Sequence, residues 1–375
     1  MRLIICLELI LVLFLSVSCN KTANVDSDGQ RCDTVGLKYA EHINIIKCSK
    51  YDIVELKDPW KKGQVLHKYV LVHRKDLANI KNLPEGTIVY VPIKSSVVFN
   101  SSHCQLLSWL GVSNLIKGVC DKQYIKLEDI QNGLKKGTIA DCGSSIMPMV
   151  ERVVDLNPDI IMLSPFENAS YGQLEKVGIP IIECAEYMET SALGRSEWMK
   201  FYGLLFGCEE RADSLFNVVD SCYNKLKEAA KAAKSHPKVL TERKTGNVWY
   251  CPGGNSTMGK LFKDANISYA FSNDTHSGSL SLSPEFVIDK AGDADVWLIM
   301  SDTGNPITRK DLLLEYSGYS ELKAFRDGKI YVCYTSRKRY FEEVSFRPDF
   351  LLSDLIRIFH PDVSVIQELR YYVAL

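Results

Sequence analysis

Residues 147–164, MPMVERVVDLNPDIIMLS, hold the pattern that decides the fold of this chain. Pro148 suits the first turn of a helix, and the spacing of the apolar residues predicts a helix that ends at residue 156. Residues 159–164 then form a short apolar run that is typical of a buried strand and ends in serine. Residues 283–301, SPEFVIDKAGDADVWLIMS, repeat the same order of proline, glutamate, helix, strand and final serine. This repeat predicts two α/β lobes of related structure.

Strand and helix patterns alternate on both sides of a long helical region. Buried strands that alternate with amphipathic helices indicate βαβ units and largely parallel sheets. Residues 195–234 contain no proline and keep a helical period, and Gly207 separates two helices within them. We therefore predict an α/β fold with two Rossmann-like lobes, central mainly parallel sheets and a long rigid connecting helix.

The start of the chain has the features of an export signal. Arg2 precedes an apolar run over residues 3–15, which is too short to span a bilayer comfortably and is typical of a signal peptide. Small residues before Cys19 resemble a bacterial lipoprotein cleavage site, although Ser16 stands where leucine is usual. Lipidation at Cys19 is therefore expected, and an ordinary secretion signal with an incidental cysteine is the alternative. The predicted layout is a signal peptide over 1–18, a lipidated tether over 19–50, a first lobe over 51–192, a connector over 193–236 and a second lobe over 237–375 that ends in a helix.

Composition excludes several classes of protein. Lys and Arg number 45 against 46 Asp and Glu, so the chain lacks the basic excess of a general nucleic-acid binder. The twelve cysteines include no CxxC pair, which leaves a zinc ribbon or a thioredoxin motif without support. Most cysteines are expected to be buried free thiols, and the spacing does not determine any pairing. The sequence also lacks an HxxxH motif or a local His/Glu cluster, so no metal site for a bare ion is predicted.

Glu151 and Glu285 occupy equivalent points of the two repeats. One glutamate near a helix start has a simple explanation, because it stabilises the positive end of the helix dipole by about 0.3–1 kcal/mol. Two at matching positions form a spaced pair of anions that suits two basic patches on one partner.

The export signal, the two lobes, the connector and these glutamates together resemble the substrate-binding proteins of ABC importers. The resemblance is strongest to the group for iron-siderophores, haem and cobalamin, and residues 149–161, 193–203 and 283–287 carry it over roughly residues 85–360. It implies a periplasmic, lipid-anchored lipoprotein that is not an enzyme and has no cofactor of its own. It implies that an iron chelate, either a siderophore or haem, is captured between the lobes. The chelate is then delivered to a permease dimer with its ATPase subunits. A cobalamin carrier of the same class is the alternative. It also implies that Glu151 and Glu285 dock onto arginines of the permease.

The ligand is expected beyond the carboxyl ends of the strands, as in other open α/β sheets. The predicted ligand-binding residues are His103, Glu167, Asn168, Trp249, Tyr250 and Tyr340. The three aromatic residues suit stacking on a macrocycle or a catecholate, with core packing as the alternative for each. His103 is a candidate axial ligand, with an ordinary hydrogen-bonded histidine as the alternative. The basic run at residues 337–339 suits an anionic group of the ligand or a solvated face.

Two rival functions stay open at this point, an exported hydrolase and a surface adhesin. Residues 254–260 match the phosphate-loop pattern G-x4-G-K, but Leu261 stands where a hydroxyl is needed to hold Mg²⁺. Residues 51–74 exceed the minimal pattern of the resembled group, and the sequence assigns them no role.

Overall fold

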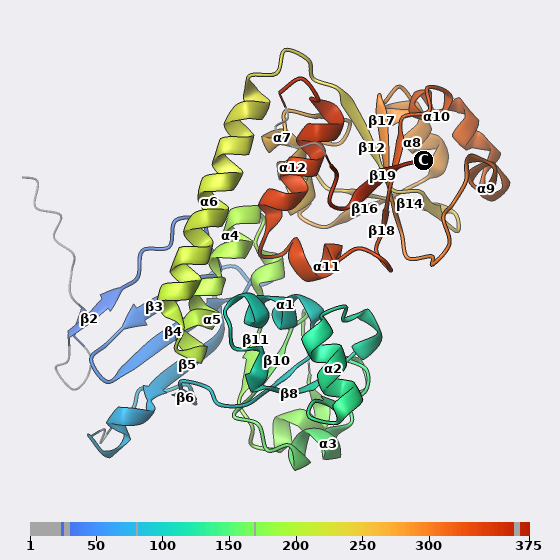
Figure 1. Ribbon diagram of the computed structural model, residues 1–375. Coiled ribbons are helices and arrows are strands. Elements are labelled where there is room, and N and C mark those ends of the chain that lie inside the picture. Colours follow the sequence, from blue (N-terminus) through green and yellow to red (C-terminus); the bar gives the residue numbers. More distant parts are fainter. Residues whose placement is uncertain (1–23, 26–30, 80–81, 169, 364–367) are drawn as a thin grey trace, which may run out of the picture.

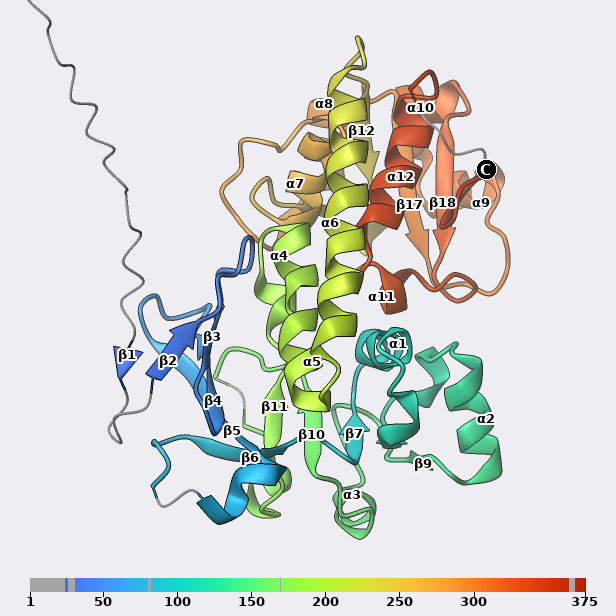
Figure 2. The same ribbon diagram turned by 60° about the vertical axis from the view of Figure 1, so that its left-hand side comes forward.

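The computed structural model describes residues 24–25, 31–79, 82–168, 170–363 and 368–375. Two α/β lobes lie one above the other, and a long helix runs along one side of both (Figures 1 and 2). The predicted signal peptide and Cys19 fall outside the described residues.

The first lobe is built on a five-stranded sheet in the order β11-β10-β7-β8-β9, and all of its pairings are parallel. Parallel strands need crossover connections, and the helices of this lobe supply them. The strands are β7 (Ser96–Val98), β8 (Ile116–Val119), β9 (Ala140–Asp141), β10 (Ile160–Leu163) and β11 (Ile181–Glu183). The helices are α1 (Ser101–Trp109), α2 (Glu128–Lys136) and α3 (Val150–Asp155), with a 3-10 turn at η4 (Gly172–Lys176).

The second lobe has a five-stranded sheet in the order β15-β12-β17-β18-β19 and a three-stranded antiparallel sheet, β13-β14-β16. The main strands are β12 (Lys238–Thr241), β15 (Ser268–Tyr269), β17 (Val296–Ser301), β18 (Ile330–Tyr334) and β19 (Tyr372–Ala374). The smaller sheet consists of β13 (Lys244–Thr245), β14 (Val248–Pro252) and β16 (Ser279–Leu282). The helices are α7 (Thr257–Asp264), α8 (Pro284–Ala291), α9 (Arg309–Glu315), α10 (Lys323–Arg326), α11 (Tyr340–Glu343) and α12 (Pro348–Phe359).

The repeat seen in the sequence is a structural one. In each lobe a helix, α3 or α8, leads into a strand of the main sheet, β10 or β17. Pro284 stands in the first turn of α8, as predicted. Pro148 does not start α3, because it pairs with Gly143 in an isolated bridge and the helix begins at Val150.

The connector consists of α4 (Ala192–Glu197), α5 (Met199–Phe206) and the longest helix, α6 (Glu209–Lys231). Gly207 ends α5 in the left-handed region at φ 67°, a conformation that favours glycine. Phe216, Val219 and Tyr223 form the buried stripe of α6, which packs against α5 and α12. Arg211 of α6 also donates to the Trp109 carbonyl of α1 in the first lobe at 2.7 Å. The helix therefore contacts both lobes, and the predicted fold class is confirmed.

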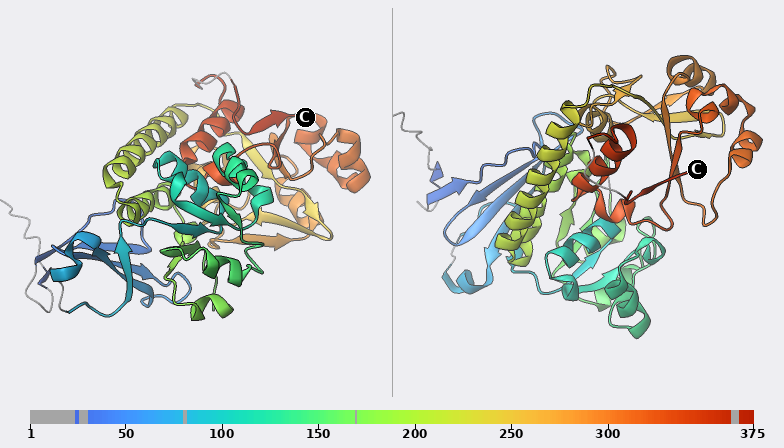
Figure 3. Two further views of the ribbon diagram at one scale, coloured as in Figure 1. Left: turned by 60° about the horizontal axis from the view of Figure 1, so that its bottom comes forward. Right: turned by 45° about the horizontal axis from the view of Figure 1, so that its top comes forward.

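Six strands between Asn24 and Val91 form a feature that the sequence did not reveal, a sheet separate from those of both lobes. The strands run in the order β1 to β6 and lie beside the connector (Figure 3). They are β1 (Asn24–Val25), β2 (Arg31–Thr34), β3 (Ile43–Lys47), β4 (Tyr51–Lys57), β5 (Val65–His73) and β6 (Thr87–Val91). The prediction that a tether extends to residue 50 is therefore wrong from residue 31 onward. Alternate residues of β3 and β4 are buried, and Ile43, Ile45, Val54 and Leu56 join the main hydrophobic core together with residues of the connector.

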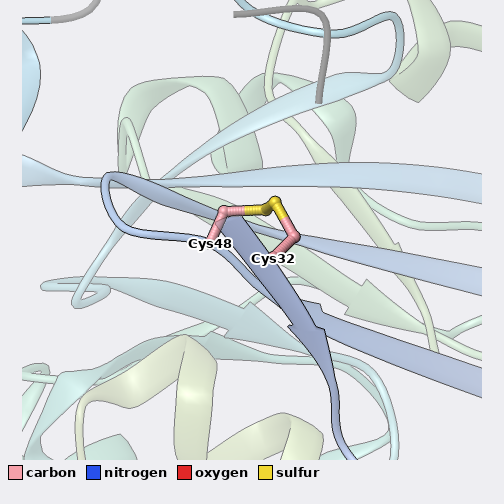
Figure 4. Close-up of a disulfide and its surroundings, with 2 residues drawn as sticks. All are labelled: Cys32 and Cys48. Atoms are coloured by element: carbon pink, nitrogen blue, oxygen red, sulfur yellow. A yellow bond between two sulfur atoms is a disulfide. The ribbon is translucent and has the colours of Figure 1, made fainter. Parts of the chain in front are cut away.

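A disulfide between Cys32 and Cys48 joins β2 to the end of β3 within this accessory sheet (Figure 4). The other cysteines that the structure describes are free, and most are buried. The expectation of mainly buried free thiols is therefore confirmed for the described residues.

Two buried carboxylates fasten the N-terminal segment to the connector. The Glu197 carboxylate accepts hydrogen bonds from the backbone N–H groups of residues 38–40 at 2.7–3.0 Å. The Glu189 carboxylate accepts from the N–H groups of Glu41 and His42 and from the indole N–H of Trp198. Charged acceptors of this kind form the stronger class of hydrogen bond, so they position the accessory sheet firmly against α4.

Candidate ligand cleft

The carboxyl edges of the two main sheets face each other. In the first lobe β7 leads directly into α1, in the second lobe β18 leads into α11, and α1 packs against α11. A direct hydrogen bond joins the lobes here, from the backbone N–H of Lys126 to Oε1 of Glu342 at 2.6 Å. Ligands of open α/β sheets bind at such edges, so the space between these edges is the candidate cleft.

A cavity of about 600 Å³ opens at the carboxyl ends of β7 and β10. This volume lies in the range of small-molecule sites. None of the described residues that line it carries a charge. Ile146 and Phe166 are 90% and 60% exposed, which is unusual for large apolar side chains that serve no partner. The wall also includes Phe99, Asn100, Ser145, Ser164 and Tyr171.

Glu167 and Asn168 follow Phe166 on the loop after β10 and are exposed beside this cavity. Asn168 has a positive φ of 55°, and its side-chain oxygen lies 3.5 Å from the Lys61 ammonium of the accessory sheet. The loop therefore lies between the first-lobe cavity and the accessory sheet.

The three predicted aromatic ligand contacts have different environments. Trp249 is fully buried, packs against Trp297 and Tyr319, and donates its indole N–H to the Thr241 carbonyl at 2.9 Å. It belongs to the core of the second lobe and does not line the cleft, contrary to the prediction. Tyr250, its neighbour on β14, points the other way and is 46% exposed, as strand alternation requires. Tyr340 is largely buried at the start of α11, where its ring contacts Phe341 and Tyr371.

His103 is also buried rather than exposed to the cleft, contrary to the role proposed for it as an open axial ligand. Its Nε2 lies 3.0 Å from Oε1 of Glu186 and 3.2 Å from the Tyr202 hydroxyl. Burial opposes the charged form of His103, but Cys184 and Glu186 outweigh it and raise the pKa of His103 to about 10. Burial likewise opposes ionisation of Glu186, and His103 and Arg195 overcome it and hold the pKa of Glu186 at about 2.

The basic run at residues 337–339 lies on the loop after β18, at the cleft edge of the second lobe. The Arg337 guanidinium donates to the Gly304 carbonyl on the loop after β17. The Arg339 guanidinium reaches across to the Lys126 carbonyl of the first lobe at 3.4 Å. This loop therefore brings positive charge to the junction of the two lobes at Lys126.

Glu242 follows β12 directly, and its ionisation predicts how the stability of the protein depends on pH. Burial raises the pKa of its carboxyl group from 4.5 to about 7. The folded protein then holds a proton that the unfolded chain has released, so the free energy of unfolding falls as pH rises through this window. Between about pH 5 and about pH 8 the free energy of unfolding of the wild type falls. We expect Glu242→Gln to make this fall smaller by roughly 1–3 kcal/mol. Urea unfolding of both proteins at the two pH values measures the difference. If the free energy of unfolding changes equally with pH in the two proteins, the raised pKa of Glu242 is contradicted.

Glu151 and Glu285 are exposed in the first turns of α3 and α8. Apolar side chains with exposed surface lie next to both of them in the sequence. These neighbours are Met149 and Val154 in the first lobe and Phe286 in the second.

The phosphate-loop pattern has a packing explanation. A Cβ atom on Gly254 or Gly259 would come within 2.4–2.6 Å of backbone carbonyl oxygens. Gly254 is therefore needed for close packing against the backbone of residues 271–274, and Gly259 for close packing against the loop itself. The Lys260 ammonium donates to the Thr190 hydroxyl at 2.6 Å, which ties α7 to the connector.

No helix among the described residues is both long and apolar enough to cross a bilayer.

Known proteins resemble this chain in sequence and in fold. Residues 97–335 match the periplasmic binding protein family. An uncharacterized lipoprotein of Methanocaldococcus jannaschii is 28% identical over 351 residues, which span 87% of this chain and 82% of the relative. The petrobactin-binding protein YclQ of Bacillus subtilis is 30% identical over 154 residues, which span 40% of this chain and 46% of that protein. A periplasmic haem-binding protein of Pseudomonas aeruginosa has a similar fold, with a TM-score of 0.59 and 19% identity over 75% of this chain and 97% of its own. These matches cover both lobes and the connector, and the chain belongs to the periplasmic binding protein family.

Proposed function

We propose that the protein is the substrate-binding component of an ABC importer, held at the membrane by a lipid on Cys19, which captures an iron chelate and delivers it to a permease and its ATPase subunits. Relatives named as petrobactin-binding and iron-hydroxamate-binding proteins support the class of ligand. Relatives named as lipoproteins support the anchor.

The uncharged cavity of the first lobe carries the proposal for the ligand. A polyanionic chelate needs cationic partners on each side, whereas the flat face of a macrocycle needs apolar and aromatic contacts. Ile146 and Phe166 offer such contacts, and we assign the positive charge that would meet carboxylates of the ligand to Arg337 and Lys338 on the second-lobe loop after β18. Of the candidate ligands, haem best matches an uncharged cavity in one lobe and basic residues in the other. Cobalamin, whose corrin ring is also a macrocycle, is the second candidate.

The docking role of Glu151 and Glu285 is part of the same proposal. Each carboxylate is exposed beside apolar residues with exposed surface, one set on each lobe. A partner that spans the two lobes buries both the charges and the apolar surface, as expected for a permease with one basic patch for each glutamate.

Ligand titration of residues 20–375 tests the function. Haem, cyanocobalamin and a ferric siderophore are added separately, and binding is followed by absorbance and tryptophan fluorescence. We expect saturable haem binding at micromolar affinity or tighter, about −8 kcal/mol. Ile146→Asp is expected to weaken it about tenfold or more, because the charge is desolvated against the ligand face.

Val65→Asp is the matched control, since Val65 is an exposed apolar residue of the accessory sheet. Binding of none of the three ligands contradicts the function. Equal losses in the two variants contradict the location of the site.

A further inference from the structure

The ligand cleft does not account for one buried group of side chains. His103 on α1, Cys184 directly after β11 and Glu186 at the start of the next 3-10 turn converge, with their donor atoms all within 4.8 Å of one another. All three residues are buried. They offer nitrogen, sulfur and oxygen, the set of donors from which protein zinc sites are built.

The spacing is close to that of a zinc site. Bonds of about 2.0–2.3 Å in a tetrahedron place neighbouring donor atoms about 3.3–3.8 Å apart. One pair of atoms, His103 Nε2 and Glu186 Oε1, lies 3.0 Å apart, and one donor atom from each of the three residues lies within 4.8 Å of the others. The upper limit is about 1 Å above the spacing of a tetrahedral site.

The surroundings of the three residues suit a bound ion. The Tyr202 hydroxyl donates to Oε2 of Glu186 at 2.8 Å, so it orients the carboxylate as outer partners of metal ligands do. Nε2 of His103 already contacts Glu186 and Tyr202, whereas Nδ1 is buried and has no hydrogen-bond partner, so Nδ1 is the ring nitrogen that an ion would satisfy. The ring of Phe346 lies 5.8 Å from the His103 ring and helps to form an apolar shell.

The donor set suits a divalent ion. A metal ion binds the carboxylate, thiolate and neutral imidazole forms of such residues, so Glu186 and Cys184 would provide two anionic donors. Arg195, whose charge acts on Glu186, opposes a cation here, so both anionic donors are needed.

We propose that His103, Cys184 and Glu186 bind one zinc ion that joins α1 to the end of β11, with Tyr202 as the outer partner of Glu186. Three protein ligands leave one tetrahedral position for a non-protein ligand such as water. The ion is separate from any metal carried by the ligand. The site lies in the first lobe at the edge that faces the cleft, so it stabilises the wall on which the ligand rests.

The full chain, produced in medium with Zn²⁺ and purified in detergent, tests this site. We expect about one zinc per chain by elemental analysis. Protein produced with Co²⁺ instead is expected to show thiolate-to-cobalt absorption in the near ultraviolet. Cys184→Ala is expected to lose this absorption and most of the metal, and Glu186→Gln to lose most of the metal.

Cys120→Ala is the matched control, because Cys120 is another buried free cysteine of the same lobe, and it is expected to keep both signals. Circular dichroism establishes that each variant is folded. A folded wild-type chain without zinc overturns the proposal. So does a cobalt–thiolate band that persists in Cys184→Ala, and in that case a different cysteine holds the ion.

Discussion

Import by cells that carry only the double variant Glu151→Ala, Glu285→Ala is expected to fall to background, while ligand affinity stays within about twofold of wild type. Both carboxylates lie on the surface, at the starts of α3 and α8, and neither lines the first-lobe cavity. Their loss removes the charge pairs that would position the permease, and it leaves the cleft intact. Ligand uptake by whole cells and titration of the purified variant measure the two effects separately.

The control for this variant removes two other exposed glutamates, Glu210 and Glu228 of α6, by alanine substitution. It changes the net charge by the same amount and is expected to import normally. Wild-type import by the Glu151/Glu285 variant removes the docking assignment. Equal loss in the control variant shows that total charge, and not position, is responsible.

Glu197→Ala is expected to destabilise the protein by roughly 2–5 kcal/mol. The fully buried carboxylate accepts the backbone N–H groups of residues 38–40 and pairs with the Lys200 ammonium at 3.0 Å. Alanine leaves these donors buried without an acceptor, so the segment that connects the accessory sheet to α4 detaches. Urea unfolding measures the loss of stability, and hydrogen exchange at residues 38–42 locates it.

Glu209→Ala is the control, because Glu209 also joins the connector to the accessory sheet, through an exposed ion pair with Lys47. Exposed pairs of this kind contribute about 0–1 kcal/mol. If both variants lose the same stability, or if exchange at residues 38–42 does not change, the buried carboxylate does not fasten this segment.

The residues facing the cleft show how far sequence patterns reach. Glu167 and Asn168 were expected beyond the carboxyl ends of the strands, and the structure places them directly after Phe166, which lines the cavity with Ser145 and Ile146. The sequence did not show which of Trp249 and Tyr250 is buried. Adjacent strand residues point to opposite faces, and both residues are aromatic. Only the packing of β14 on Trp297 decides which of the two is buried.

The accessory sheet was missed for a different physical reason. Its strands pair in chain order and the Cys32–Cys48 disulfide is local, but the carboxylates of Glu189 and Glu197 that fasten it to the connector lie about 150 residues away in the chain. No window of sequence contains both members of these carboxylate contacts. The buried group of His103, Cys184 and Glu186 is a similar case, since its members lie far apart in the chain and no local spacing motif connects them.

By itself the sequence determined the two α/β lobes, the helical connector with its break at Gly207, and the equivalent positions of Glu151 and Glu285. These features depend on local periodicity and on residues with strong backbone preferences, which act over a few turns of chain. The tertiary structure alone decided which aromatic residues are buried, where the uncharged cavity opens and which side chains converge inside the first lobe. Burial and convergence depend on contacts between distant segments, and these form only when the lobes, the connector and the accessory sheet pack together.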